Sequence, residues 1–216
     1  MWSFLAIVFM VNITIAVMGI ILAFALQKPG LFLKKANGLL SPASYLVFWP
    51  YFTLNTITLV LFRVFSQENV LDEVCPNLYM GSKLYKTDYK LFASLGIKST
   101  LDLTSEFSET DFIRQQPNYL CLPVLDTSAP TLEQLEQAVE WISTHLLEGP
   151  IYVHCALGHG RSAVVVAGFL IKTGIANDVN KAIKLLKTKR SGINLHPKQL
   201  SVLKRLTRRC ISTQCN

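Results

Sequence analysis

Hydrophobic residues are concentrated at the start of the chain, where two long stretches carry no charged side chain. The first runs from Met1 to Gln27 and the second from Ala36 to Phe62. Each exceeds the roughly 20 apolar residues that an α-helix needs to cross a hydrocarbon core. We therefore expect a transmembrane helix at 1–27, a basic link at 28–40, and a second transmembrane or interfacial helix at 41–62.

Both apolar stretches leave an alternative open. The first could be a signal peptide, because Ala23-Phe24-Ala25 resembles a cleavage site. It lacks a basic n-region, however, and its apolar core is long, so a retained helix is the favoured interpretation. The second contains Pro50, which is expected to kink it, and an interfacial or re-entrant hairpin is the alternative to a second crossing.

From Arg63 onward, short apolar runs alternate with amphipathic stretches. Strands are expected at 77–81, 97–103, 119–125 and 151–153, and helices at 87–95, 131–148, 162–173, 178–189 and 197–209. Thr131 and Gln134 form a capping box at the start of one helix. Alternating strands and helices predict an α/β domain at 63–216, with a sheet covered on its faces.

Charge is distributed unevenly along the chain. Residues 1–62 carry three lysines and no acid, residues 63–149 carry six basic and thirteen acidic residues, and residues 150–216 carry twelve basic residues and one acid. The cationic last third suggests an anionic substrate or lipid surface, or simply solvated lysine-rich helix faces. Five cysteines without a CxxC pair argue against a disulfide scaffold or a zinc ribbon and favour a reducing compartment.

One segment carries recognisable chemistry, and its sequence from Ile151 to Ser162 is IYVHCALGHGRS. It leads from a buried strand through a glycine-bearing turn into a helix, so successive backbone N–H groups can surround a tetrahedral anion. The residues expected to bind phosphate are Ala156, Leu157, Gly158, His159, Gly160 and Arg161. Arg161 offers a planar fork for two phosphate oxygens, and the same field stabilises a Cys155 thiolate. Ser162 can donate a hydrogen bond to that sulfur, and His154 is expected to orient the loop.

Other interpretations of this segment are weaker. A cysteine in an apolar strand is often inert. His154, Cys155 and His159 could bind a metal, but no fourth ligand lies at a convincing spacing, so no metal is expected. A cysteine, two glycines, an arginine and a serine at fixed offsets favour a phosphatase.

HCALGHGRS resembles the H-C-x5-R-S/T loop of the cysteine-dependent protein tyrosine phosphatase superfamily, most closely its dual-specificity branch. The resemblance extends to NLYMGS at 77–82, LDLT at 101–104, LPVLD at 122–126 and Lys189-Arg190 with Gln199. It implies a central sheet of about five strands flanked by helices, metal-free and cofactor-free hydrolysis of phosphate monoesters, and a phosphocysteine intermediate. Asp126 matches the general acid of this family. An Asp126 without a chemical role is the alternative, and Asp102 and Glu106 are rival acids.

The resemblance leaves the substrate open. Phosphoproteins carrying phosphorylated Tyr, Ser or Thr are the first expectation, and a phosphoinositide or phosphatidylglycerophosphate is the alternative. A non-catalytic membrane scaffold that binds phosphorylated partners is a third hypothesis, disfavoured by the intact nucleophile. The membrane is an expected partner, and nucleic acid is not. Because a thiolate needs a reducing medium, the catalytic domain is expected on the cytosolic side, although two crossings would then place Lys28, Lys34 and Lys35 outside.

Overall fold

The computed structural model describes the backbone of residues 2–214 and the side chains of residues 4–209. The helices are α1 (Trp2–Ala25), α2 (Pro42–Phe65), α3 (Tyr89–Ser94), α4 (Asp111–Arg114), α5 (Leu132–His145), α6 (Arg161–Lys172), α7 (Val179–Lys189) and α8 (Pro197–Gln214), with 3-10 turns η1 (Pro29–Phe32) and η2 (Lys86–Asp88). The strands are β1 (Leu71–Cys75), β2 (Leu78–Gly81), β3 (Ser99–Thr104), β4 (Asn118–Val124) and β5 (Ile151–His154).

The five strands form one mixed sheet in the order β1-β2-β5-β3-β4. β5 lies at its centre and runs parallel to both neighbours, whereas β1 pairs antiparallel with β2 at the edge. The predicted fold class, a sheet of about five strands flanked by helices, is confirmed. The edge strand β1 was not expected from the hydrophobic pattern, because Asp72 and Glu73 interrupt its apolar residues.

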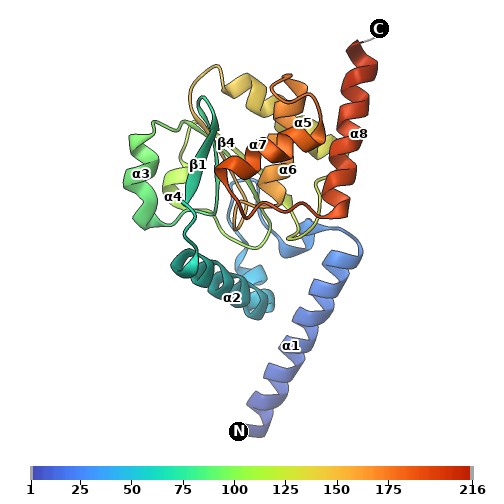
Figure 1. The fold of residues 1–216 in the computed structure, drawn as a ribbon. Helices are drawn as coiled ribbons and strands as arrows, with labels where there is room; N and C mark the ends of the chain where they lie inside the picture. Colours follow the sequence, from blue (N-terminus) through green and yellow to red (C-terminus); the bar gives the residue numbers. More distant parts are fainter. Residues whose placement is uncertain (1, 215–216) are drawn as a thin grey trace.

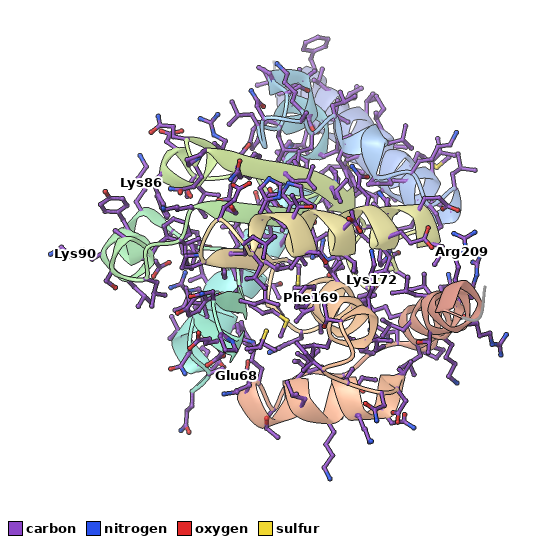
Figure 2. The ribbon with its side chains drawn as sticks, turned by 90° about the horizontal axis from the view of Figure 1, so that it is seen from above. Glu68, Lys86, Lys90, Phe169, Lys172 and Arg209 are labelled. Carbon is purple, nitrogen blue, oxygen red and sulfur yellow. The ribbon has the colours of Figure 1, made fainter. Side chains whose placement is uncertain are left out.

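Helices cover both faces of the sheet. On one face, α5, α6, α7 and α8 enclose the largest buried cluster, and α6 is buried along almost its whole length. On the other face, Phe92 of α3 and Ile113 of α4 belong to one buried cluster with Tyr152 of β5. Lys86 and Lys90 mark the α3 side and Arg209 the α8 side, at opposite ends of the view in Figure 2. β5 is therefore buried between the two layers of helices.

The local capping signals of two helices had different outcomes. Thr131 caps α5 with Gln134 in the predicted capping box, with Thr131 Oγ1 accepting from the Gln134 N–H at 3.1 Å. In the helix expected at 87–95, Thr87 lies inside η2, and Asp88 takes the position before α3. The Asp88 carboxylate accepts hydrogen bonds from the Tyr85 backbone N–H and from the Arg63 guanidinium. These bonds stabilise the turn before α3.

Two helices of the described chain are long and apolar enough to span a membrane, at Phe4–Ala25 and Pro42–Phe65. Figure 1 shows α1 projecting away from the sheet, while α2 lies beneath the sheet and its flanking helices. α2 carries a kink, where Phe48 departs from helical backbone angles shortly before Pro50. The two helices therefore differ in how they relate to the rest of the fold.

The link between α1 and α2 packs against the domain that follows. The Nζ atom of Lys34, whose side chain is 1% exposed, lies 2.6 Å from a carboxylate oxygen of Asp102 in β3. Lys34 also donates to the hydroxyl and carbonyl oxygens of Thr104. Burial alone would raise the pKa of Asp102, but the Lys34 ammonium holds it well below its usual range. Lys34 thus fixes the basic link to the domain, and Phe32 of the same link is fully buried.

Replacing Lys34 with alanine is expected to destabilise the protein by about 3–5 kcal/mol, because Asp102 would keep a buried charge without its partner. Urea unfolding of the full chain in detergent micelles measures this loss. Lys35→Ala is the matched control, since Lys35 is exposed on the same link. Its free energy of unfolding should stay within about 0.5 kcal/mol of the wild type. Equal stability of the two variants would contradict the role of the buried pair.

Candidate active site

The candidate site lies where the central parallel strands end. His154, the last residue of β5, pairs in register with Gly81 at the end of β2 and with Asp102 in β3. Cys155 follows directly, and the chain then turns through 156–160 into α6. The carboxyl ends of parallel strands meet at one edge, so residues from distant parts of the chain converge there.

The turn after Cys155 needs glycine for two different reasons. Gly158 has a φ of +80°, and a Cβ atom there would lie 2.5 Å from the backbone carbon of Gly81. Gly160 does not use the left-handed region, since its φ is −110°. A Cβ atom at Gly160 would instead approach the side-chain amide of Gln199 at 3.0 Å. Gly158 therefore supplies an unusual backbone angle, whereas Gly160 supplies space for the Gln199 side chain.

The sulfur of Cys155 lies at the floor of this turn and is surrounded by donors. The Gly158 N–H points to Sγ at 3.3 Å, and the Ser162 hydroxyl lies 3.4 Å from it. α6 begins at Arg161 with Gly160 as its N-cap, so the positive end of the helix dipole faces the same region. These groups together favour negative charge on the sulfur or on an anion beside it.

Arg161 is fully buried and is held in place by Glu106. Its guanidinium makes a two-point contact with the Glu106 carboxylate, at 2.6 and 2.9 Å, and donates to the Val124 carbonyl at 2.9 Å. Burial would lower the pKa of Arg161, but the Glu106 carboxylate more than offsets this and raises it. The same pairing keeps the pKa of the buried Glu106 carboxyl below its ordinary value. The guanidinium is therefore charged and fixed in orientation.

Asp126 is the half-exposed carboxylate at the site. It follows β4 and places Oδ1 3.0 Å from the Arg161 guanidinium, with 47% of its side chain exposed. The two rival acids lie elsewhere: Glu106 is occupied by Arg161, and Asp102 bonds to Lys34 and accepts from Tyr119 at 2.7 Å. Of the three carboxylates, Asp126 alone lines the pocket.

A pocket of about 180 Å³ brings these groups together. It is lined by Asp126, Thr127, Cys155, Leu157, His159, Gly160, Arg161, Asn194, His196 and Gln199. Asn194 and His196 come from the loop between α7 and α8, and no motif in the sequence indicates that they line the pocket. Gln199 was noted only through the resemblance, and it donates to the Ser128 carbonyl at 2.9 Å, joining α8 to the Asp126 loop.

The two histidines of the motif have separate surroundings. His154 is fully buried behind the loop, where its ring stacks on Tyr152 and Nδ1 lies 3.3 Å from the Cys155 carbonyl. It is thus placed to support the loop, as expected. His159 lies at the rim, with Nε2 hydrogen-bonded to Glu68 and its ring edge against Phe62 of α2 at 5.2 Å between centroids.

A buried polar cluster lies beneath residues 155–161, the segment called the phosphate loop from here on. Asp102, Glu109 and His154 come close enough together to suggest metal ligands. Each carboxylate already has an ammonium partner, however, since Lys34 bonds to Asp102 and Lys83 lies 2.9 Å from Glu109. The two lysine ammonium groups balance the charges of the two carboxylates without a metal ion. The cluster therefore fits a structural role better than a metal site.

Glu68 and Arg190 fasten the loop from its outer side. Arg190 is buried, pairs with Glu68 and Asp72, and donates to the Leu157 carbonyl at 3.1 Å. Glu68 also accepts from the Gly192 N–H at 2.8 Å. Burial would raise the pKa of Glu68, but its bonds to His159 and Gly192 and the Arg190 charge lower it. Glu68 had no signal in the sequence, because its partners lie more than 90 residues away.

The chain matches the family model of the dual specificity phosphatase catalytic domain over residues 78–209. It is 27% identical to phosphatidylglycerophosphate phosphatase PTPMT2 of Arabidopsis thaliana, over 81% of this chain and 78% of that protein. It is 28% identical to dual specificity protein phosphatase 9 of Homo sapiens, over 56% of this chain and about a third (32%) of that protein.

Solved structures share the fold. PTPMT1 in complex with PI(5)P superimposes with a TM-score of 0.59 at 22% identity, covering 68% of this chain and 99% of that one. The active form of Tk-PTP gives a TM-score of 0.60 at 22% identity, covering 65% and 97%. The family match spans more than half of the chain and includes both Cys155 and Arg161. The chain belongs to the dual specificity phosphatase family and is a cysteine-dependent phosphatase.

Proposed function

We propose that the chain hydrolyses phosphate monoesters in two steps through Cys155, Arg161 and Asp126. In the first step the Cys155 thiolate attacks phosphorus, the P–O bond to the leaving group breaks, and Asp126 gives its proton to the departing oxygen. Arg161 and the loop N–H groups hold the phosphoryl oxygens as charge shifts among them. The products are an alcohol and a phosphocysteine.

In the second step water cleaves the phosphocysteine. The Asp126 carboxylate accepts a proton from the attacking water, the S–P bond breaks, and inorganic phosphate leaves with the thiolate regenerated. Ser162, 3.4 Å from the sulfur, can donate to the departing thiolate. The acid of the first step thus becomes the base of the second.

The proposed substrate is a phospholipid that carries a terminal phosphate monoester. The observation that carries this proposal is the contact of α2 with the phosphate loop, since Leu59 clusters with Ala156 and Phe62 packs on His159. An apolar helix directly at the rim would keep the pocket beside a lipid surface. The Arabidopsis relative, named as a phosphatidylglycerophosphate phosphatase, supports the same substrate class.

A phosphoprotein is the second candidate. The human relative is named as a dual specificity protein phosphatase. The variable loop positions Ala156, Leu157 and His159 also lack the additional lysine or arginine side chains that would favour a highly charged lipid headgroup. A non-catalytic scaffold is not favoured, because the family match and the intact cysteine indicate turnover.

Full-length protein reconstituted in vesicles is expected to release phosphate faster from phosphatidylglycerophosphate or a phosphoinositide than from phosphotyrosyl or phosphothreonyl peptides. A malachite-green assay on matched phosphate concentrations measures the ranking. Cys155→Ser should reduce release from every substrate to background, because an alkoxide forms far less readily than a thiolate. Faster turnover of peptides would overturn the lipid proposal, whereas residual activity in Cys155→Ser would overturn the mechanism.

Asp126→Asn is expected to lower kcat on alkyl phosphates by about 10²–10⁴-fold, with little change in substrate binding. The loss should shrink for aryl phosphates with acidic leaving groups, which depart without a proton. The pH dependence of kcat on alkyl phosphates should also differ between the wild type and Asp126→Asn, because asparagine has no proton to donate. An unchanged rate and pH profile would show that Asp126 is not the acid.

Glu106→Gln is expected to lower kcat/KM by about 10²-fold, because Arg161 loses the carboxylate that fixes its orientation. Steady-state kinetics with a soluble aryl phosphate measure the effect. Glu136→Gln serves as the control, since Glu136 pairs with Arg209 far from the pocket. If Glu106→Gln retained full activity, the two-point contact would not be needed to position Arg161.

A further inference from the structure

α2 contacts the catalytic domain at both of its ends. Near its start, the Tyr45 hydroxyl lies 2.8 Å from the Ser108 hydroxyl. Near its end, the Arg63 guanidinium makes a two-point contact with Asp88, both bonds measuring 2.7 Å. A spanning helix must have its ends on opposite sides of a hydrocarbon core about 30 Å thick. A helix whose two ends are fixed to one soluble domain does not meet this requirement.

The middle of α2 also lies on the domain. Its inward face is formed by Ser44, Phe48, Phe52 and Leu59. Phe48 and Phe52 share a buried cluster with Leu125, which precedes Asp126, and Leu59 packs against Phe107. The start, middle and end of α2 therefore all contact the catalytic domain, and part of the helix lies beside the active site.

The opposite face of α2 is apolar and exposed. Its side chains are Leu46 (73% exposed), Leu54 (62%), Ile57 (50%), Val60 (43%), Leu61 (50%), Val64 (68%) and Phe65 (79%). No charged residue occurs between Ala36 and Phe62. A face of this size without charge needs a nonaqueous partner.

α1 indicates what that partner is. Apart from Ala16 and Ala23, its apolar side chains are mostly exposed, and only 6% of its apolar window is buried. A helix that is hydrophobic on every side needs to be surrounded by apolar material, which a bilayer provides and a single docked protein face does not. α1 and α2 pack together, with Gly19 of α1 in close contact with the Phe48 ring. The apolar surroundings that α1 requires are therefore also in reach of α2.

A hydrogen bond between the two helices fits a water-free setting. Pro50 has no N–H, so the Leu46 carbonyl one turn earlier lacks its helical donor. Asn12 of α1 donates its side-chain amide to that carbonyl at 3.1 Å, and Trp49 donates to the Asn12 oxygen at 3.0 Å. In hydrocarbon, a carbonyl freed by proline has to be satisfied by a neighbouring helix. These polar atoms satisfy one another inside an otherwise apolar pair.

We infer that α1 is the one bilayer crossing among the described residues and that α2 lies within the lipid leaflet on the catalytic side. The link, which is anchored by Lys34 to Asp102, lies on that same side, and the start of α1 lies on the other. Lys28 and Lys35 then flank the crossing on the catalytic side, which the positive-inside tendency would place in the cytosol. This arrangement holds whether the substrate is a lipid or a protein.

Sealed vesicles containing the full chain test this orientation. Single cysteines are introduced at Asn37 in the link and at Lys187 on α7, both exposed, in a background without native cysteines, and an epitope is placed ahead of α1. A membrane-impermeant maleimide should label Asn37→Cys and Lys187→Cys from the same face, and protease should reach the epitope only from the other face. Labelling of Asn37→Cys opposite to Lys187→Cys would establish two crossings and overturn the inference. Access to all three from one face would equally overturn it.

The protease measurement also works with the native cysteines in place, so it decides the case if the cysteine-free background does not fold. A nitroxide at Leu54→Cys tests the leaflet contact, and one at Lys187→Cys is the matched control. Oxygen should relax the Leu54 probe more than a water-soluble nickel chelate does, and the order should reverse at Lys187. A Leu54 probe that is shielded from both, with spin–spin broadening, would indicate a second copy of the chain in place of lipid and overturn the proposal.

Discussion

The two-point contact between Arg161 and Glu106 is the interaction on which the phosphate site depends. A guanidinium at the floor of a pocket has lost its water, so it needs a fixed anion beside it to offset the cost of burial and to hold its orientation. Glu106 can supply that anion because β3 lies next to β5 in the sheet and both strands run in the same direction. The carboxylate that follows β3 and the arginine that follows β5 are thereby brought to the same edge. The order of the strands in the sheet thus brings the two charged groups of the site together.

A second set of charges lies beneath the first and connects the site to the apolar N-terminal segments. Asp102 and Glu109 are buried below the loop, and each depends on a lysine from another part of the chain. For Asp102 that lysine is Lys34, which belongs to the link between α1 and α2. A buried carboxylate without its cation would be costly, so the link is held to the domain by the same electrostatics that support the loop. The link between the two apolar segments is therefore fixed to the catalytic domain through Lys34.

The sequence was most informative where the chemistry is local. Cys155, Gly158 and Arg161 lie within seven residues, so the geometry of one strand, one turn and one helix start was enough to anticipate their arrangement. Glu106 was considered only as a rival acid, because nothing in its own neighbourhood indicates that its partner lies 55 residues later. Lys34 likewise was treated as a link charge. Pairings of this kind depend on the order of strands in the sheet, which hydrophobic periodicity does not specify.

The position of α2 also bears on which substrates can reach Cys155. Cys155 is 3% exposed, so a phosphate has to enter the pocket fully before attack. The rim has an apolar side, where Phe62 of α2 packs against His159, and a polar side formed by Asn194 and His196. With α2 in the leaflet, a lipid headgroup could enter while its acyl chains stay beside the helix, so little hydrophobic surface would have to leave the bilayer. A phosphopeptide would have to approach from the polar side, and its affinity would then depend on the loop between α7 and α8.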